Sequence, residues 1–113
     1  MLDLNKIAEE CNKYSIMRIK NGAKIDIDPL KACAGELIEA VEAKDNYDDN
    51  ADLISVDLGY LHDDIKADYA DELMDAFYCL LVACHKDGID VEKALLKNID
   101  KNKKRALCMG DKK

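Results

Sequence analysis

The chain has 113 residues, and its 24 acidic against 17 basic side chains give a formal net charge of −7. A chain of this length can bury roughly two thirds of its unfolded surface, which is enough for one domain with its own core. The negative charge disfavours a non-specific grip on nucleic-acid phosphates. The lack of any apolar run near about 20 residues excludes a membrane protein.

Aliphatic side chains are available to fill the core, and aromatic ones are scarce. Hydrophobic residues make up 49% of the chain and aromatic residues only 5%, with no Trp. Such a core suits packed helices better than a β-sandwich, whose strands favour β-branched and aromatic residues. The five cysteines form no CxxC pair and the N-terminal segment has no signal-peptide pattern. We therefore expect a protein of the reducing cytoplasm.

Residues 2–20 carry the spacing of an amphipathic helix. Their apolar side chains recur at steps of three or four: Leu4, Ile7, Ala8 and Cys11. Asp3 can cap this helix, and the pair Asn21-Gly22, which tolerates the left-handed conformation, predicts its end. The sequence KIDIDP that follows alternates briefly like a strand, but it is too short to predict a sheet.

A second helix is predicted from Asp28-Pro29 to about Lys44. Asp28 can cap it, and proline suits the first helical turn. Residues 45–52 are polar and rich in Asn and Asp, which predicts a loop. A short helical piece is predicted for about residues 53–63.

The strongest helical pattern begins near Asp68 and ends at Gly88. A last helix is predicted from Asp90, whose side chain can cap it, through Leu107. No segment alternates with a period of two for long enough to form a sheet. The sequence therefore predicts an all-α fold, a bundle of four to five helices in one domain.

Two acidic side chains lie in or beside the most apolar part of the chain. Between Leu73 and Cys84 the only charged residue is Asp75, and Glu72 falls on the same stripe of the helix. Both sides of this stretch are apolar, so we expect it to be buried all round, with Glu72 and Asp75 pointing into protein. An ionised carboxylate placed there needs a proton, a basic side chain or a cation.

A second acidic pair, Glu36 and Glu39, lies on the preceding predicted helix. The two residues are three apart and therefore share one face. If the two helices pack side by side, the four carboxylates of ExxE and ExxD meet across one groove. Hard oxygen ligands in that number suit Mg²⁺ or Mn²⁺, not zinc or copper. The alternative is that these acids form solvated helix faces, which is the usual role of an isolated acidic pair.

These motifs resemble those of a known family. The segments GELIEAVEA (residues 35–43) and DELMDAFYCLLVACHKDGIDVEKAL (residues 71–95) resemble the MazG-type all-α nucleoside triphosphate pyrophosphohydrolases. That superfamily also holds dimeric dUTPases and dCTP pyrophosphatases. Its ExxE and ExxD motifs are followed by a turn and by a helix that ends in Asn and Arg, here Gly88-Ile89-Asp90, Asn102 and Arg105. The resemblance covers about residues 30–107, and the domain core is expected at about residues 28–107.

The resemblance implies a cofactor, a reaction and an assembly. One or two Mg²⁺ ions, with Mn²⁺ as the other candidate, are expected on the four carboxylates: Glu36, Glu39, Glu72 and Asp75. The family reaction is attack of water at the α–β linkage, which releases a nucleoside monophosphate and pyrophosphate. Glu39 is the candidate to orient or deprotonate that water. The family also implies dimers or tetramers.

The last predicted helix carries a row of basic residues with two interpretations. Four of them recur every four residues: Lys93, Lys97, Lys101 and Arg105. One interpretation is a solvated face that also favours the C-terminal end of the helix. The other is that Arg105, with Asn102, binds the phosphates or the sugar of the substrate, because a guanidinium group matches a phosphate with paired donors.

The apolar helix after Asp68 is hard to cover within one chain, so we expect a homodimer or a homotetramer. Two functions from different classes remain open. The first is a Mg²⁺-dependent pyrophosphohydrolase whose partner is a nucleoside triphosphate, with neither nucleic acid nor a membrane as partner. The second is a non-catalytic helical dimer whose acidic groove binds a basic partner, or a nucleotide without turnover.

Overall fold

The computed structural model describes residues 2–24, 28–50 and 59–108. Within these ranges the chain forms four helices and no strand: α1 (Leu4–Lys20), α2 (Pro29–Asp49), α3 (Gly59–Lys86) and α4 (Val91–Leu107). The prediction of an all-α fold is confirmed. None of these described helices combines the length and the apolar run that crossing a membrane requires.

The starts of α1, α2 and α4 and the end of α3 follow from local sequence as predicted. Asp3, Asp28 and Asp90 are N-caps whose carboxylates accept hydrogen bonds from backbone N–H groups of the first turn. After α3, Gly88 adopts φ +67° and the N–H of Ile89 donates to the carbonyl of Cys84 at 2.9 Å. This backbone conformation favours glycine, so the predicted stop at Gly88 has a clear physical cause.

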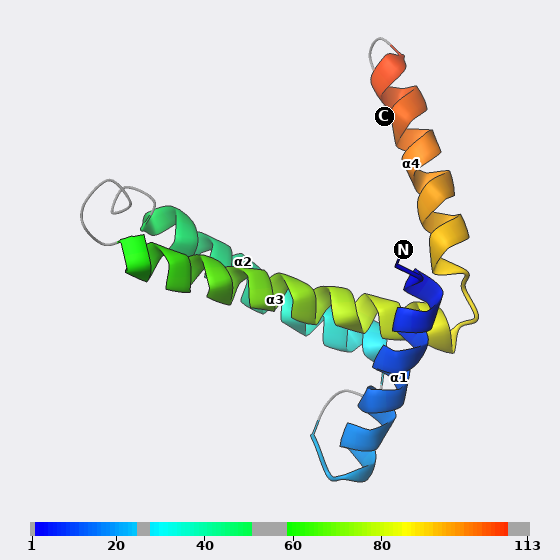
Figure 1. Ribbon diagram of the computed structural model, residues 1–113, viewed down its shortest axis with the longest axis horizontal. Helices are drawn as coiled ribbons and strands as arrows, with labels where there is room; N and C mark the ends of the chain where they lie inside the picture. The colour runs from blue at the N-terminus through cyan, green and yellow to red at the C-terminus, as the bar shows by residue number, and fades with distance from the viewer. Residues whose placement is uncertain (1, 25–27, 51–58, 109–113) are drawn as a thin grey trace.

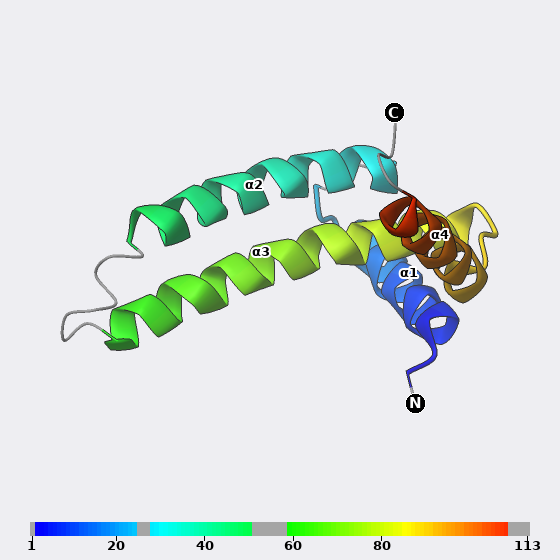
Figure 2. The same ribbon diagram turned by 90° about the horizontal axis from the view of Figure 1, so that it is seen from above.

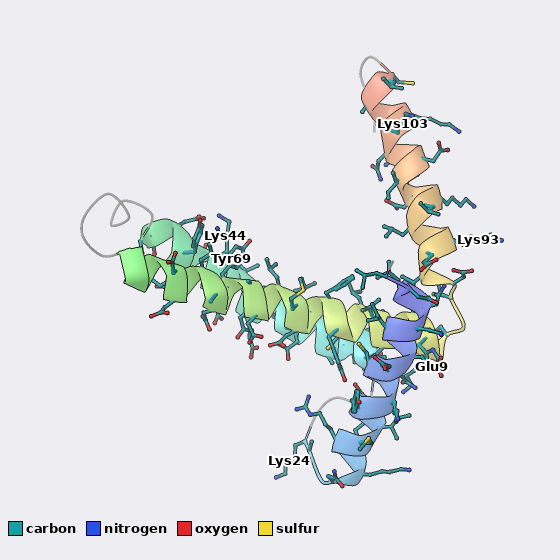
Figure 3. All side chains as sticks on the ribbon, viewed as in Figure 1. Glu9, Lys24, Lys44, Tyr69, Lys93 and Lys103 are labelled. Carbon is teal, nitrogen blue, oxygen red and sulfur yellow. The ribbon has the colours of Figure 1, made fainter. Side chains whose placement is uncertain are left out.

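Helix α2 is longer than predicted, because residues 45–49 are helical instead of forming a loop. Its last turn packs on α3 through Tyr47, whose ring stacks on Tyr69 with centroids 5.7 Å apart. Lys44 pairs with Asp48 one turn later, and its ammonium group lies over both rings. Figure 3 shows Lys44 beside Tyr69. These contacts stabilise a helical turn that its Asn and Asp residues alone disfavour. Residues 51 and 52 of the predicted loop lie outside the described residues.

Helix α3 begins at Gly59, about nine residues before the start predicted near Asp68. Residues 59–63, which were predicted to belong to a separate short piece, form its first turns. Near the predicted start, Tyr69 stacks on Tyr47, which joins α3 to the extended end of α2. Residues 53–58 of that piece, and residues 25–27 of the strand-like segment, lie outside the described residues.

The core of the fold is the antiparallel pair α2 and α3, which lie side by side along most of their length (Figures 1 and 2). Small residues permit this close approach, since Cys33, Ala40 and Ala76 are buried where the two helices meet. The Cys33 thiol donates to the carbonyl of Ala76 at 3.5 Å. A pair held this closely fixes which side chains of the two helices face each other.

Helix α1 crosses α3 at the end of the pair where α2 begins and α3 ends (Figure 1). The Tyr78 hydroxyl donates to the carbonyl of Cys11 at 2.7 Å and accepts from Ser15 at 3.3 Å. These bonds fix α1 against α3.

The start of α4 is held by α1. The N–H of Leu4 donates to Glu92 at 3.0 Å, and the Asn5 side chain bonds both Asp90, at 2.9 Å, and the N–H of Val91, at 2.7 Å. Beyond this junction α4 points away from the α2–α3 pair (Figure 1).

The middle of α3 is not buried all round in the single chain, contrary to the sequence-based expectation. Leu73, Phe77 and Leu80 remain 39%, 42% and 42% exposed. Helix α2 runs along one side of α3, α1 crosses another side near the C-terminal end of α3, and α4 makes few contacts with it. The remaining apolar side is left uncovered in the described part of the chain.

Candidate functional site

The two predicted acidic pairs face each other across the α2–α3 contact. Glu36 and Glu39 come from the middle of α2, and Glu72 and Asp75 from the middle of α3. Because the helices run antiparallel and pack through small residues, one pair is brought opposite the other. The carboxylate oxygens of Glu36, Glu39 and Glu72 all lie within 4.8 Å of one another.

A fifth acid, Asp71, joins this cluster and was not identified from the sequence. Its carboxylate oxygen, with those of Glu72 and Asp75, forms a second group within 4.8 Å. Glu72 belongs to both groups, so the five acids form one continuous cluster. The signal was present in the sequence, since Asp71 lies one helical turn before Asp75.

Two oxygens of this cluster are buried without a hydrogen-bond donor. Glu36 Oε2 and Glu72 Oε2 are both shielded from solvent and have no partner among the described residues. A buried carboxylate oxygen without a donor is costly, because it has lost its hydration. Either a proton or a cation can compensate for that loss.

The protonation equilibria of the cluster agree with this geometry. Burial raises the pKa of Glu36, and the neighbouring Glu39 raises it further. Burial and Glu39 likewise raise the pKa of Glu72. The pKa of Asp75 is raised by burial and by Asp71, against an opposing effect of Arg18. Carboxylates that repel one another in this way favour a cation between them.

The donor set fits a hard divalent cation. In the described part of the chain, the groups that could hold an ion consist of carboxylates alone. The nearby thiols of Cys33 and Cys79 have pKa values raised by burial and by Glu36, so they stay protonated at neutral pH and are poor zinc ligands. Oxygen ligands and two unpartnered buried oxygens suit Mg²⁺ or Mn²⁺.

A cavity of about 530 Å³ adjoins the acids on the side of α1. Glu36, Glu39 and Asp75 line one part of it, and three basic residues line it as well: Arg18, Lys24 and Lys86. A smaller cavity of about 410 Å³ lies toward the other end of the α2–α3 pair, where its charged lining is acidic throughout: Glu39, Glu42, Asp68 and Glu72. Of these two cavities, only the larger combines residues of the acidic cluster with positive charge.

The structure does not bring Asn102 and Arg105 to the acids within one chain. Both residues are on α4, which contacts α1 and α3 but not α2 among the described residues. The Asn102 side chain instead donates to Asn98 one turn earlier, at 2.8 Å to its side-chain oxygen. The guanidinium group beside the acids comes from α1, as Arg18.

Arg18 was not singled out from the sequence, although a weak signal exists. Asn12, Ser15 and Arg18 recur at steps of three, which places them in one polar row along α1. All three line the larger cavity. The sequence alone does not show that this row faces the acids, because that depends on where α1 crosses α3.

An all-α fold that pairs an ExxE helix with an ExxD helix is the architecture of the MazG-like nucleotide pyrophosphohydrolase superfamily. Over residues 5–103 the chain matches the sequence model of phosphoribosyl-ATP pyrophosphohydrolase, and it belongs to that family. No curated protein and no solved structure gives a significant match to the chain. The family consists of pyrophosphohydrolases that act on nucleotide-like substrates.

Proposed function

We propose that this protein is a Mg²⁺-dependent enzyme that hydrolyses a nucleoside triphosphate at the α–β linkage, releasing a nucleoside monophosphate and pyrophosphate. The observation that carries the proposal is the acidic cluster, in which Glu36 and Glu72 each have a buried oxygen without a donor. The membership of the family supports the same reaction class. We place the enzyme in the cytoplasm, whose reducing conditions suit its five free cysteines.

The acidic cluster has to bind a substrate that is itself negatively charged. Glu36, Glu39, Glu72 and Asp75 would hold the cation, Mg²⁺ or Mn²⁺. When bound, this cation would neutralise phosphate charge and polarise the phosphoryl oxygens. Without it, the triphosphate would be repelled both by the cluster and by the net charge of −7.

Glu39 is the residue that we assign to the attacking water. It is more exposed than Glu36 and Glu72, and it lines both cavities next to the acids. A carboxylate in this position can accept a hydrogen bond from water, orient its lone pair toward the α-phosphorus and take up its proton. Glu36 and Glu72, which are half-buried, would instead keep their carboxylates directed at the cation.

Phosphoribosyl-ATP is a second candidate substrate, because the matching family is described by that compound. Its α–β linkage is the same anhydride as in ATP, so the chemistry at the acidic cluster is unchanged. Hydrolysis would give phosphoribosyl-AMP and pyrophosphate. The two candidates differ only at the end of the molecule that is remote from the triphosphate.

The test is to incubate the purified protein with a panel of ribonucleoside and deoxyribonucleoside triphosphates and phosphoribosyl-ATP. Pyrophosphate and orthophosphate are measured separately, with Mg²⁺, with Mn²⁺ and with a chelator. We expect pyrophosphate only, and only with a cation. Tight nucleotide binding without any pyrophosphate release would instead support the non-catalytic alternative, in which the groove binds a nucleotide or a basic partner.

Variants locate the activity in the cluster. Glu39→Gln is expected to lower kcat by at least about 100-fold, the usual contribution of a positioned acid–base group. Glu72→Gln is expected to lower turnover strongly as well, because it removes a group that would hold the cation. Glu42→Gln is the matched control, because Glu42 lies one turn after Glu39 but is in neither candidate cation group. Near wild-type turnover in folded Glu39→Gln and Glu72→Gln proteins would end the proposal.

We also propose that the protein assembles as a homodimer or homotetramer. Large apolar side chains remain exposed on α2 and α3: Leu37, Ile38, Val41, Leu73, Met74 and Phe77. Burying such a patch between copies would stabilise an assembly. A second copy is also the source from which Asn102 and Arg105 of α4 could reach the phosphates or sugar of a bound substrate.

A further inference from the structure

One tyrosine hydroxyl joins α1 to α3 beside the acidic cluster. Tyr78 lies one helical turn after Asp75 on α3, and both residues line the larger cavity. The Tyr78 hydroxyl donates a hydrogen bond to the carbonyl of Cys11 at 2.7 Å and accepts one from the Ser15 hydroxyl at 3.3 Å. Because Cys11 and Ser15 are four residues apart, this hydroxyl is bonded to two successive turns of α1. The two bonds together fix the position and the rotation of α1 at this point.

Arg18 lies one turn beyond this contact. It follows Ser15 by three residues, which is a rise of about 4.5 Å along α1. Arg18 lines the same cavity as Asp75, and its charge lowers the pKa of Asp75 against the larger effect of burial. The step of three residues from Ser15 to Arg18 on α1 equals the step from Asp75 to Tyr78 on α3. The contact that holds Ser15 against Tyr78 therefore also sets where Arg18 lies relative to Asp75.

The contacts of α1 with α4 lie far from Arg18. They involve Leu4 and Asn5, at the start of α1. Asn5 precedes Arg18 by 13 residues, which is about 20 Å along a helix. A tilt of α1 by about 5° about its start would move Arg18 by about 1.7 Å, enough to take a hydrogen bond of about 2.9 Å beyond the limit of about 3.5 Å. The contact with α4 is thus too remote to hold Arg18 in place, whereas the contact with Tyr78 is close to it.

We propose that Tyr78 is a positioning residue, whose hydroxyl holds Arg18 where it binds a phosphate of the substrate at the acidic cluster. This inference rests on the proposed function, because it gives Tyr78 a part in binding the triphosphate that acts through Arg18. The paired donors of a guanidinium group bind a phosphate only when they are aligned with it, so a small displacement of α1 weakens the contact. A tyrosine that only stabilised the packing of α1 would affect the folded state without this dependence on Arg18.

A double-mutant cycle separates the two roles, because Tyr78→Phe keeps the ring and removes only the hydroxyl. The four proteins are wild type, Tyr78→Phe, Arg18→Gln and the double variant. The probe is ATP with a methylene group between its α- and β-phosphorus atoms, titrated with Mg²⁺ by isothermal titration calorimetry, so that affinity is measured without turnover. Tyr78→Phe should raise Kd about fivefold in the wild-type background and have no further effect in the Arg18→Gln background. In steady-state kinetics, Tyr78→Phe should raise KM by about the same factor, with a smaller change in kcat.

Two variants of α1 serve as controls. Tyr14→Phe removes the hydroxyl of an exposed tyrosine outside the three cavity linings and should leave Kd unchanged. Asn5→Ala loosens the other end of α1 and should lower Tm without changing Kd, because α1 would then still be held close to Arg18. If Tyr78→Phe does not fold, Ser15→Ala removes one of the same bonds from the side of α1, and it should show the same dependence on Arg18 in a cycle of its own.

The inference would be overturned if Tyr78→Phe left Kd unchanged, or raised it equally with Arg18 present and replaced. It would also be overturned if wild type did not bind the analogue, or if Asn5→Ala weakened binding as much as Tyr78→Phe. Failure of the proposed function is a different result, in which the analogue binds with the expected coupling but no triphosphate yields pyrophosphate.

Discussion

Replacing Glu36 with glutamine is expected to stabilise the cation-free protein at neutral pH and to remove most of its stabilisation by Mg²⁺. The substitution keeps the shape of the side chain and removes one negative charge from the cluster. The wild-type cluster gains from a cation because its carboxylates repel one another and two of its oxygens are unpartnered. The variant should therefore have less repulsion to relieve and a weaker cation site.

The size of the effect follows from the geometry. Two unit charges at 4.8 Å, the upper limit for the Glu36 and Glu39 oxygens, repel by about 1 kcal/mol in a water-like dielectric. Removing this repulsion should raise Tm by about 4 °C for a domain of this size. Mg²⁺ at a hundredfold excess over its Kd should add about 2.7 kcal/mol to wild type, or about 10 °C.

The pH dependence has a definite sign. Because the pKa values of Glu36 and Glu72 are raised in the folded protein, the folded state holds more protons than the unfolded state above the ordinary carboxylate range. The stability that these groups contribute is present below their unfolded-state pKa values and is lost as the pH rises through the folded-state values. Cation-free wild type should therefore unfold at a lower temperature at pH 8 than at pH 5.

Differential scanning fluorimetry at both pH values, with Mg²⁺ or with a chelator, measures the Tm gain of the variant, the stabilisation by Mg²⁺ and the pH dependence of Tm. The Glu36→Gln variant should show a smaller decrease in Tm between pH 5 and pH 8, and only a small shift with Mg²⁺. Glu42→Gln removes the same charge outside the candidate cation groups and should behave like wild type. The reasoning would be refuted if Glu36→Gln kept the full Mg²⁺ shift, or if Glu42→Gln lost it equally.

Three further predictions concern binding, folding and assembly. Arg18→Gln should raise KM about tenfold with a smaller change in kcat, because Arg18 would bind a substrate phosphate. Arg18→Lys should recover part of this loss. In steady-state kinetics, a constant KM in both variants would contradict this role of Arg18. Asn5→Ala removes two of the three hydrogen bonds described between α1 and the start of α4 and should cost about 1–3 kcal/mol. Chemical denaturation measures this cost, and an unchanged midpoint would argue against this junction. Light scattering should give a mass above 12.7 kDa, and Phe77→Lys should lower it; a 12.7 kDa species at all concentrations would contradict the assembly.

Much of the fold could be read from local sequence, because the signals are themselves local. The three aspartate caps and the turn at Gly88 depend on hydrogen bonds within a few residues. The step of three between Glu36 and Glu39, and between Glu72 and Asp75, places each pair on one helix face whatever surrounds it. The local pattern was wrong where helix ends depend on a distant partner, as at Tyr47, whose ring stacks on Tyr69.

The amino-acid order alone therefore determined the all-α class, three capped helix starts and two acidic pairs, since backbone capping and helical periodicity need no partner. Tertiary packing decided that Glu36 meets Glu72, that Asp71 and Arg18 join them, and that α4 points away. Those outcomes depend on how closely α2 and α3 approach through Cys33 and Ala76, and on where α1 crosses them. The charges of the acids are local, but their repulsion, and so their need for a cation, arises only when the two helices pack.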